Sequence, residues 1–514
     1  MWQKYTVVRL ALPFLCGMCG AAALMGRCTW RTDMLFVVMC CLLMATVVCH
    51  RAAAHAPLFR HVFAASVAGL FLLLGATLYI IRYNNVVASI DVQQTSFCGT
   101  VTGMPQPKPR TVAVQVRLDD GGLMLAYVQS DTAHSPHQLQ TGDTLFFSPL
   151  HVNSTCPLTL PDTSVFRNYN SNLFFRGIAA TCYVPSNRWT HTSPAQRDAT
   201  WNERLHRYYA QSPLDSVTVS MVEALTIGRR EGLSRQLRAD YSAAGVSHVL
   251  ALSGMHLHLL VALLNLLIFS FLSYGYRRFA MLAVIPLLWM FTYVAGAPPS
   301  LVRAAVMATF LQIGFACGRV YFVLNALALA AIVMLTYDPL VLHNVGFQLS
   351  FLSMLGVALL FKQFLLSTSH SAEATMPHIP LWMRLLRPLV TVIMMTFSTT
   401  LFTAPLVAYH FGQLPVFGLL TNLIVPFLTS LLMYASVAWL LLFFWPAAQA
   451  VVGTWLDALV SGQNTVVETI ASWPASHIDF RPSALVTLLL YAALCFVLCF
   501  SLRRKSPASP RAHA

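Results

Sequence analysis

The chain alternates between long apolar runs and one polar segment with a different period. Runs of roughly 20 residues are long enough to cross a hydrocarbon core of about 30 Å. We expect membrane spans at 7–25, 34–49, 62–81, 248–272, 281–295, 301–317, 322–335, 347–361, 389–408, 416–445 and 484–500. Residues 451–470 fit either a crossing or an interfacial helix. The pattern predicts about 10 to 12 crossings of a polytopic α-helical membrane protein.

Residues 91–188 alternate apolar and polar positions between turn signals, as half-buried strands do. One example is the run TVAVQVR at 111–117, followed closely by the turn sequence Asp119-Asp-Gly-Gly122. About five such strands in roughly a hundred residues predict a small antiparallel barrel or sandwich. An inserted OB-like β-barrel domain fits this pattern best.

Residues 189–247 predict two short amphipathic helices that lie against the membrane or the bundle. The run Ser212-Pro213-Leu-Asp215 predicts a capping box with proline at the first helical position, and Val217, Met221 and Leu225 then repeat along one face. The predicted organisation is 1–90 for the N-terminal spans, 91–188 for the β domain, 189–247 for the interfacial helices, 248–502 for a second transmembrane domain and 503–514 for a basic tail.

Composition agrees with a membrane protein. Apolar residues make up 57% of the 514 residues and charged residues only 10%, whereas soluble proteins carry roughly a quarter charged residues. The formal net charge of +14 permits a polyanionic substrate, but topology signals and lipid headgroups explain it equally well. Residues 1–26 are expected to be a retained first helix rather than a cleaved leader.

Basic loop residues predict the orientation of the spans. Those that fit a cytoplasmic side are Arg51, Arg60, Arg277, Arg278, Arg384, Arg387, Arg503, Arg504 and Lys505. This places both termini in the cytoplasm and the β domain outside. Arg229, Arg230, Arg235 and Arg238 would then also lie outside, and substrate contact is one reason for them to do so.

Three of the twelve cysteines, Cys98, Cys156 and Cys182, fall in the predicted outside domain. Oxidation is permitted there, so we expect one disulfide among them, with all three pairings open. The cysteines in the apolar spans are most simply small hydrophobic residues, and no metal site is expected among them.

Polar residues gather at the head of the fourth predicted span, in GVSHVLALSGMHLH at 245–258. Polar groups at membrane depth are costly and usually face a cavity or another helix, so Ser253, Gly254 and His256 are candidates for lining a transport path. A Ser253–His256 pair could instead serve an intramembrane hydrolase, but no acid partner or G-x-S-x-G elbow accompanies it. His256 and His258 are poorly spaced for a metal on a helix. Polar packing between helices is the remaining alternative.

Other polar positions recur at the ends of the later spans. Arg303, inside the predicted bundle, needs a carboxylate, a carbonyl or a passing anion. Gln348 and Ser350 interrupt the predicted span at 347–361. Each position alone is more often a packing residue, whereas together they describe a bundle with hydrated interior positions.

The order of these segments resembles the ComEC competence proteins, inner-membrane DNA-uptake channels of transformable bacteria, over nearly the whole chain. The matching positions are Gly228, Arg230, Gly245, His248, Ala251, Ser253, Gly254, His256, Ser300, Arg303, Ala304, Pro405, Asn422 and Pro426, with 168–178, 325–330, 338–339, 346–351 and 410–413. Arg229, Glu231 and His258 depart from the family's usual residues.

The resemblance implies a channel for single-stranded DNA in the inner membrane, used in natural transformation. Gly228, Arg229, Arg230, His248, Ser253, Gly254, His256, Arg303 and Gln348 would line the path or contact DNA. Lys108, Arg110, Arg117, Phe146, Phe147, Phe166 and Arg167 are candidates for a groove on the β domain.

Expected partners are single-stranded DNA, lipid, an outside DNA receptor, a cytosolic helicase or motor, and a separate nuclease. Longer members of the family carry a metallo-β-lactamase-like domain, but this sequence contains no H-x-H-x-D-H and no G-x-x-x-x-G-K-[ST]. We therefore expect no enzyme activity and no cofactor. The alternatives are a membrane-embedded hydrolase or lipid-acting enzyme, or a transporter of another polyanion.

Overall fold

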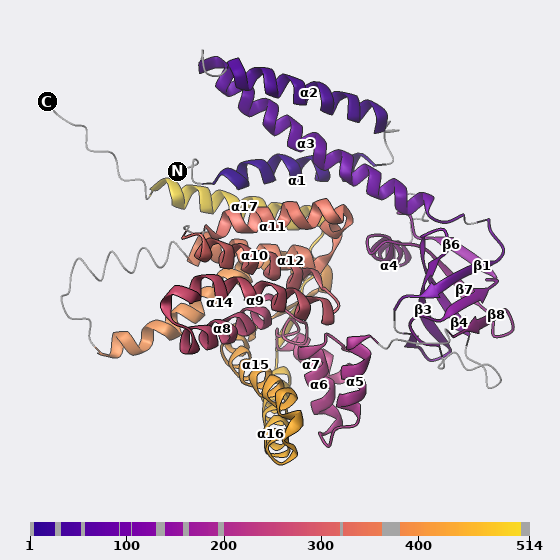
Figure 1. The fold of residues 1–514 in the computed structure, drawn as a ribbon, viewed down its shortest axis with the longest axis vertical. Helices are drawn as coiled ribbons and strands as arrows, with labels where there is room; N and C mark the ends of the chain where they lie inside the picture. The colour runs from indigo at the N-terminus through magenta and orange to yellow at the C-terminus, as the bar shows by residue number, and fades with distance from the viewer. Residues whose placement is uncertain are drawn as a thin grey trace. The chain divides into compact units, whose positions relative to one another are not determined.

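The computed structural model describes residues 5–25, 32–52, 57–91, 93–103, 105–129, 139–157, 164–193, 200–318, 322–361 and 381–504 (Figure 1). Contacts divide the chain into two compact units, one of residues 1–204 with 306–348 and one of 205–305 with 349–514. Helices α10 (Pro299–Ala316) and α12 (Val345–Gly356) each span a boundary between the units.

The first unit opens with α1 (Thr6–Leu24), α2 (Thr32–Ala52) and α3 (Pro57–Ala88). Two glycines let α1 and α3 approach closely. A Cβ on Gly17 would lie 1.9 Å from the Leu72 carbonyl oxygen, and one on Gly75 would lie 2.2 Å from that of Phe14. Small residues at the contact are typical of membrane helix pairs. Helix α11 (Val323–Tyr337) and the short helix η3 (Pro339–His343) also belong to this unit.

The same unit contains a strand-rich domain, as the alternating pattern predicts. Its strands are β1 (Phe97–Val101), β2 (Gln106–Pro107), β3 (Thr111–Leu118), β4 (Leu123–Gln129), β5 (Thr144–Phe147), β6 (His151–Ser154), β7 (Ile178–Val184) and β8 (Trp189–Thr192). They are hydrogen-bonded in the order β6-β7-β4-β3-β1-β5-β8, and β2 pairs with β3. Val114, Val116, Met124 and Ala126 are fully buried at alternate positions, which places the core on one face of the sheet.

Two features of this domain go beyond the predicted antiparallel strands. Strands β4 and β7 pair in parallel, and the helix α4 (Ser164–Phe174) precedes β7. In addition, β5 and β6 follow one another with only residues 148–150 between them, yet β5 pairs with β1 and β8 whereas β6 pairs with β7. The described strands form no direct pairing between β6 and β8, so a closed barrel is not shown.

The second unit begins at Leu205, within α5 (Trp201–Ala210), and continues with α6 (Ser216–Thr226) and α7 (Arg235–Ala243). Its remaining elements are α8 (Gly254–Phe271), α9 (Tyr274–Val294), η4 (Val357–Phe361), α14 (Leu381–Phe411), β9 (Gln413–Pro415), α15 (Gly418–Leu441), η5 (Leu442–Phe444), α16 (Pro446–Ala471), β10 (His477–Asp479) and α17 (Ala484–Arg504). Helix α6 starts three residues later than the predicted capping box: Asp215, and not Ser212, is the N-cap, and its side chain accepts a hydrogen bond from the Val217 N–H at 3.0 Å.

A buried polar network connects three helices of this unit. The Tyr241 hydroxyl on α7 donates to Asn464 Oδ1 on α16 at 2.9 Å and accepts from Gln463 Nε2 at 3.0 Å. The Thr429 hydroxyl on α15 donates to Gln463 Oε1 at 3.2 Å. Buried polar groups need such partners. The undecided segment 451–470 is therefore part of a 26-residue helix whose polar side chains bind other helices.

Six described helices are long and apolar enough to cross a membrane: Thr6–Leu24, His61–Ala88, Gly254–Phe271, Pro299–Ala316, Leu389–Phe411 and Gly418–Phe444. Shorter apolar helices lie at Met34–Cys49, Ser216–Thr226, Phe279–Val294, Val323–Tyr337, Val345–Leu360 and Ala484–Leu498. These helices agree with a polytopic membrane protein, and the total number of crossings stays a prediction.

Candidate functional site

Helix α8 begins at Gly254, six residues after the predicted start of the span at His248. Ser253 is its N-cap, and the Ser253 N–H donates to His256 Nδ1 at 3.0 Å. A side chain at the third helical position that accepts from the N-cap N–H is half of a capping box, a role usually taken by Glu or Gln. His248 lies before the helix with its side chain exposed.

The same geometry bears on the hydrolase alternative. Ser253 Oγ lies 3.1 Å from His256 Nδ1, but that nitrogen already accepts from the backbone. His256 is fully buried, and its Nε2 has no hydrogen-bond partner among the described residues. A serine–histidine pair in catalysis needs a third group that orients the imidazole. The contact is thus accounted for by the start of the helix.

The second histidine, His258, does not support a metal site with His256. His258 Nδ1 donates to the Gly254 carbonyl oxygen at 2.6 Å, so this ring also follows its own helix. Within the described ranges, no group of three His, Cys, Asp or Glu side chains could hold a metal ion.

Arg303 on α10 is 4% exposed and donates from Nε to Ser350 Oγ on α12 at 2.7 Å. Its guanidinium lies against the start of α8, because a Cβ on Gly254 would be 2.9 Å from Arg303 Nη2. Gly254, Arg303 and Ser350 come from three different sequence segments. We call these three residues, with Ser253 and His256, the arginine cluster.

Ser350 was not among the predicted site residues, although the polar pair Gln348 and Ser350 in an apolar helix was a signal for it. Gln348, which was predicted, makes a different contact. Its Nε2 donates to the Leu342 carbonyl oxygen at 2.9 Å, and that bond connects α12 with η3.

The loop between α6 and α7 contains a second group of cations. Gly228 has φ 76°, and a Cβ there would lie 2.9 Å from the Ala295 carbonyl oxygen and 3.1 Å from Leu252 Cδ1. The loop therefore lies against the end of α9 and the segment before α8.

The arginines of this loop have few partners. Arg229 Nε is 3.9 Å from Glu231 Oε2, and Arg229 Nε and Nη1 are buried without a hydrogen-bond partner among the described residues. The Arg238 guanidinium donates to the Arg230 carbonyl oxygen. Desolvation by the surrounding protein, and then the charge of Arg238, lower the pKa of Arg230. A bound anion would stabilise the charged form of Arg230 against this desolvation, so the loop is a favourable place for an anion.

The segment that contains Pro415 and Gly418 contacts Gly245 in the loop that precedes α8. Gly245 has φ 80°, and a Cβ there would lie 2.7 Å from Pro415 Cγ and 3.1 Å from Gly418 Cα. Pro415 ends β9, which pairs with β10. The second unit thus brings together segments that are far apart in the sequence.

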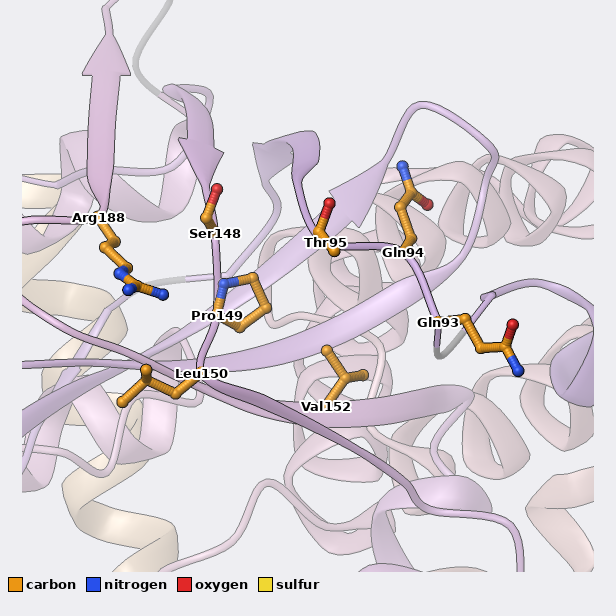
Figure 2. Close-up of a pocket in the computed structure, with 8 residues that line it drawn as sticks. All are labelled: Gln93, Gln94, Thr95, Ser148, Pro149, Leu150, Val152 and Arg188. Atoms are coloured by element: carbon orange, nitrogen blue, oxygen red, sulfur yellow. The ribbon is translucent and has the colours of Figure 1, made fainter.

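The strand-rich domain contains an open groove of about 430 Å³ at the β5–β6 corner (Figure 2). Its lining residues are Gln93, Gln94, Thr95, Ser148, Pro149, Leu150, Val152 and Arg188. Arg188 also fixes the corner, because its carbonyl oxygen accepts from the Ser148 N–H at 2.9 Å. The amides, hydroxyls and single guanidinium suit a polar ligand rather than a lipid chain.

The predicted groove candidates on this domain separate into core and surface residues. Phe147 is buried and stacks on Phe97, whereas Phe146 and Lys108 are exposed. Arg110 and Arg117 are exposed as well. The side chains of Phe166 and Arg167 lie outside the described residues.

The structure contains Cys98, Cys156 and Cys182 as free thiols, without a disulfide among them. Cys182 faces the domain core, and burial raises the pKa of its thiol to about 12. Cys156 is buried with its Sγ 3.2 Å from the Tyr83 hydroxyl of α3. Cys98 lies on β1 and is half-buried.

Comparison with known proteins identifies relatives of the helical part. A family model described as "Competence protein" matches residues 225–505, which is more than half of the chain. ComE operon protein 3 of Bacillus subtilis (strain 168) is 28% identical over 301 residues, which is 58% of this chain and 36% of that protein. The chain thus spans about a third of that relative's length. No solved structure matches.

Proposed function

Because the chain belongs to the competence protein family, we propose that it forms a channel that moves single-stranded DNA across the cytoplasmic membrane during natural transformation. The family match carries this proposal, since it covers the region that contains both the arginine cluster and the loop between α6 and α7 with Arg229 and Arg230. A DNA strand carries a negative charge on every nucleotide, so its path must supply cations.

In this proposal the arginine cluster is an anion-binding position of the path. The Arg303 side chain hydrogen-bonds a neutral hydroxyl and lies against the N-terminal end of α8, where the helix dipole is positive. The positive end of this helix beside the guanidinium favours a passing phosphate. Arg229 and Arg230 provide a second such position. Several weak positions in series let a strand bind and still leave.

We also propose that the strand-rich domain is an OB-type barrel that receives the strand. The support is its strand order. Strand β1 pairs with β3 and β5, β3 with β4, β4 with β7 in parallel, and β7 with β6. If the β5–β6 corner is counted as one bent strand, the pairings run around a five-stranded Greek-key barrel.

The remaining parts of the proposal follow from the family resemblance and from loop charges. The protein would lie in the inner membrane with both termini in the cytoplasm and the strand-rich domain outside. It would act without a cofactor and without enzyme activity of its own. An outside DNA receptor, a cytosolic motor and a separate nuclease would be its partners.

The test is complementation in a transformable host that lacks its own competence-family channel. The proposed path predicts that the wild-type gene restores transformants and that Arg303→Ala lowers their number at least tenfold. Arg277→Ala is the matched control, because Arg277 on α9 binds carbonyl oxygens of its own region, those of Leu272 and Phe269. An Arg303→Ala variant that is expressed, inserted and as active as wild type would overturn the role of the cluster.

A further inference from the structure

The outer face of the strand-rich domain presents a row of aromatic side chains across neighbouring strands. Tyr127 on β4 is in register with Tyr183 on β7, and Tyr183 is in register with His151 on β6. The chain neighbours of both tyrosines, among them Val128 and Cys182, are buried in the core. Since side chains alternate along a strand, the tyrosines point away from the core.

Two residues outside these strands extend the row. Tyr169 of α4 is 46% exposed, and its hydroxyl lies 2.5 Å from that of Tyr127. Lys108, in the segment between β2 and β3, holds its Nζ 4.6 Å from the centre of the Tyr127 ring. We call Lys108, Tyr127, His151, Tyr169 and Tyr183 the tyrosine row.

The outward-facing side chains of the row are accessible to a ligand. Tyr183 remains 37% exposed and His151 is exposed beside it, whereas the hydrophobic core of the domain is on the opposite face of the strands. Neighbouring strands are about 4.8 Å apart, so successive rings are offered at a spacing that a flexible, extended ligand can follow.

Charge indicates which kind of ligand fits. Lys108 is in the row and Arg110 is exposed two residues further on. The acidic pair Asp119 and Asp120 is in the β3–β4 turn, which the length of β4 separates from Tyr127 by roughly 13 Å at about 3.3 Å per residue. Aromatic faces with an adjacent cation suit a chain of flat rings joined by anions.

We propose that the tyrosine row binds single-stranded nucleic acid, with bases stacked on Tyr127, Tyr169 and Tyr183 and with phosphates near Lys108 and Arg110. Stacking on aromatic side chains tolerates any base sequence, as the proposed function requires. The proposal rests on that function and adds where the strand is first held. It assigns that step to base stacking, in contrast to the phosphate contacts of the arginine cluster.

The test uses the full-length protein in lipid nanodiscs and a fluorescent 20-nucleotide thymidine oligonucleotide, with binding followed by fluorescence anisotropy. Combining Tyr127→Leu with Tyr183→Leu should raise the Kd at least tenfold, because the stacking contacts of two bases with aromatic rings are lost. Tyr276→Leu with Tyr293→Leu is the matched control, since both of these tyrosines are exposed on α9, and it should leave the Kd unchanged. Replacing Tyr127 and Tyr183 by tryptophan keeps the stacking surface and should retain binding.

Several results would overturn the proposal. These are wild-type protein that does not bind the oligonucleotide, a leucine pair that binds as tightly as wild type, and a tryptophan pair as weak as the leucine pair. Displacement of the oligonucleotide by a neutral oligosaccharide such as chitohexaose would show that the row is a sugar site. Unchanged binding by the leucine pair, together with normal DNA import by wild type, would contradict the binding role of the tyrosine row and leave the proposed channel in place. Absence of import by wild type would contradict the proposed channel itself.

Discussion

At the scale of single residues, Gly254 determines where the Arg303 guanidinium can lie. A methyl group at position 254 would be 2.9 Å from Arg303 Nη2 and 3.2 Å from Ala304 Cβ. The end of an arginine side chain can move, so Gly254→Ala should leave the melting temperature close to wild type. The displaced guanidinium should lower DNA import roughly tenfold, which corresponds to about 1.4 kcal/mol.

Gly462→Ala is the control for this substitution, because nothing lies within 4 Å of a Cβ at that helical position. It should leave import unchanged. Equal import by Gly254→Ala and by the control would show that the position of the guanidinium does not matter.

Substitutions of His256 distinguish a helix-capping role of this side chain from a catalytic role. His256→Gln can still accept from the Ser253 N–H as a capping box requires, so it should keep most of the import activity. His256→Ala loses that bond and should destabilise the start of α8 by about 1 kcal/mol. Import and the melting temperature would be measured for both variants. If glutamine abolished activity as fully as alanine while the protein stayed folded, the hydrolase alternative would gain support.

Cys182 gives a pH-dependent prediction. Its pKa is raised to about 12, so the reactive thiolate is scarce at pH 7 and increases only as the pH approaches 12. In a variant that retains Cys182 as its single cysteine, maleimide labelling should be very slow at pH 7. A variant that retains only the half-buried Cys98 should label faster. A mobility change between non-reducing and reducing gels of wild-type protein would instead reveal the disulfide expected from the sequence.

At the scale of secondary-structure elements, the network around Tyr241 connects α7, α15 and α16. Tyr241→Phe would leave Asn464 and Gln463 without their shared hydroxyl, and unpaired buried polar groups cost about 1–3 kcal/mol each. The melting temperature of the purified protein should therefore fall clearly. Tyr208→Phe, which removes the more exposed hydroxyl bound by Gln449, should have a smaller effect. Equal melting temperatures for the two variants would contradict the importance of the network.

Local signals located elements more closely than they located element boundaries. The start of α6 was predicted at Ser212, three residues before its N-cap Asp215, because serine and aspartate are both common N-cap residues. The start of α8 was predicted six residues early, since the apolar pattern continues through 249–252 and histidine is an unusual partner in a capping box. Helix α16 stayed undecided because Gln463 and Asn464 interrupt its apolar pattern. Their partners, Tyr241 and Thr429, come from other helices.

The candidate site shows the same limit of prediction from local sequence patterns. Sequence reasoning selected Gly254 and Arg303 as site residues from their types and positions, and the structure places them in contact. It could not select Ser350 as the partner of Arg303, because that pair is 47 residues apart. The parallel pairing of β4 with β7 was equally beyond local patterns, since these strands are separated by β5, β6 and α4.

At the scale of the whole molecule, the protein is a set of apolar helices with two polar features that an anchor would not need. One is the buried arginine cluster in the second unit, and the other is the tyrosine row on the strand-rich domain. Both suit a negatively charged strand of nucleic acid. The family match covers the first of these features, and both features support the proposal that DNA crosses the membrane through this protein.

The most direct measurement is microscopy of fluorescent DNA in transformable cells that carry this gene as their only source of a competence-family channel. Wild-type cells should accumulate labelled DNA in the cytosol. Cells without the gene should hold it outside the inner membrane, and Arg303→Ala should resemble the deletion. Labelled DNA that reaches the cytosol at the wild-type rate in the deletion strain would contradict the account.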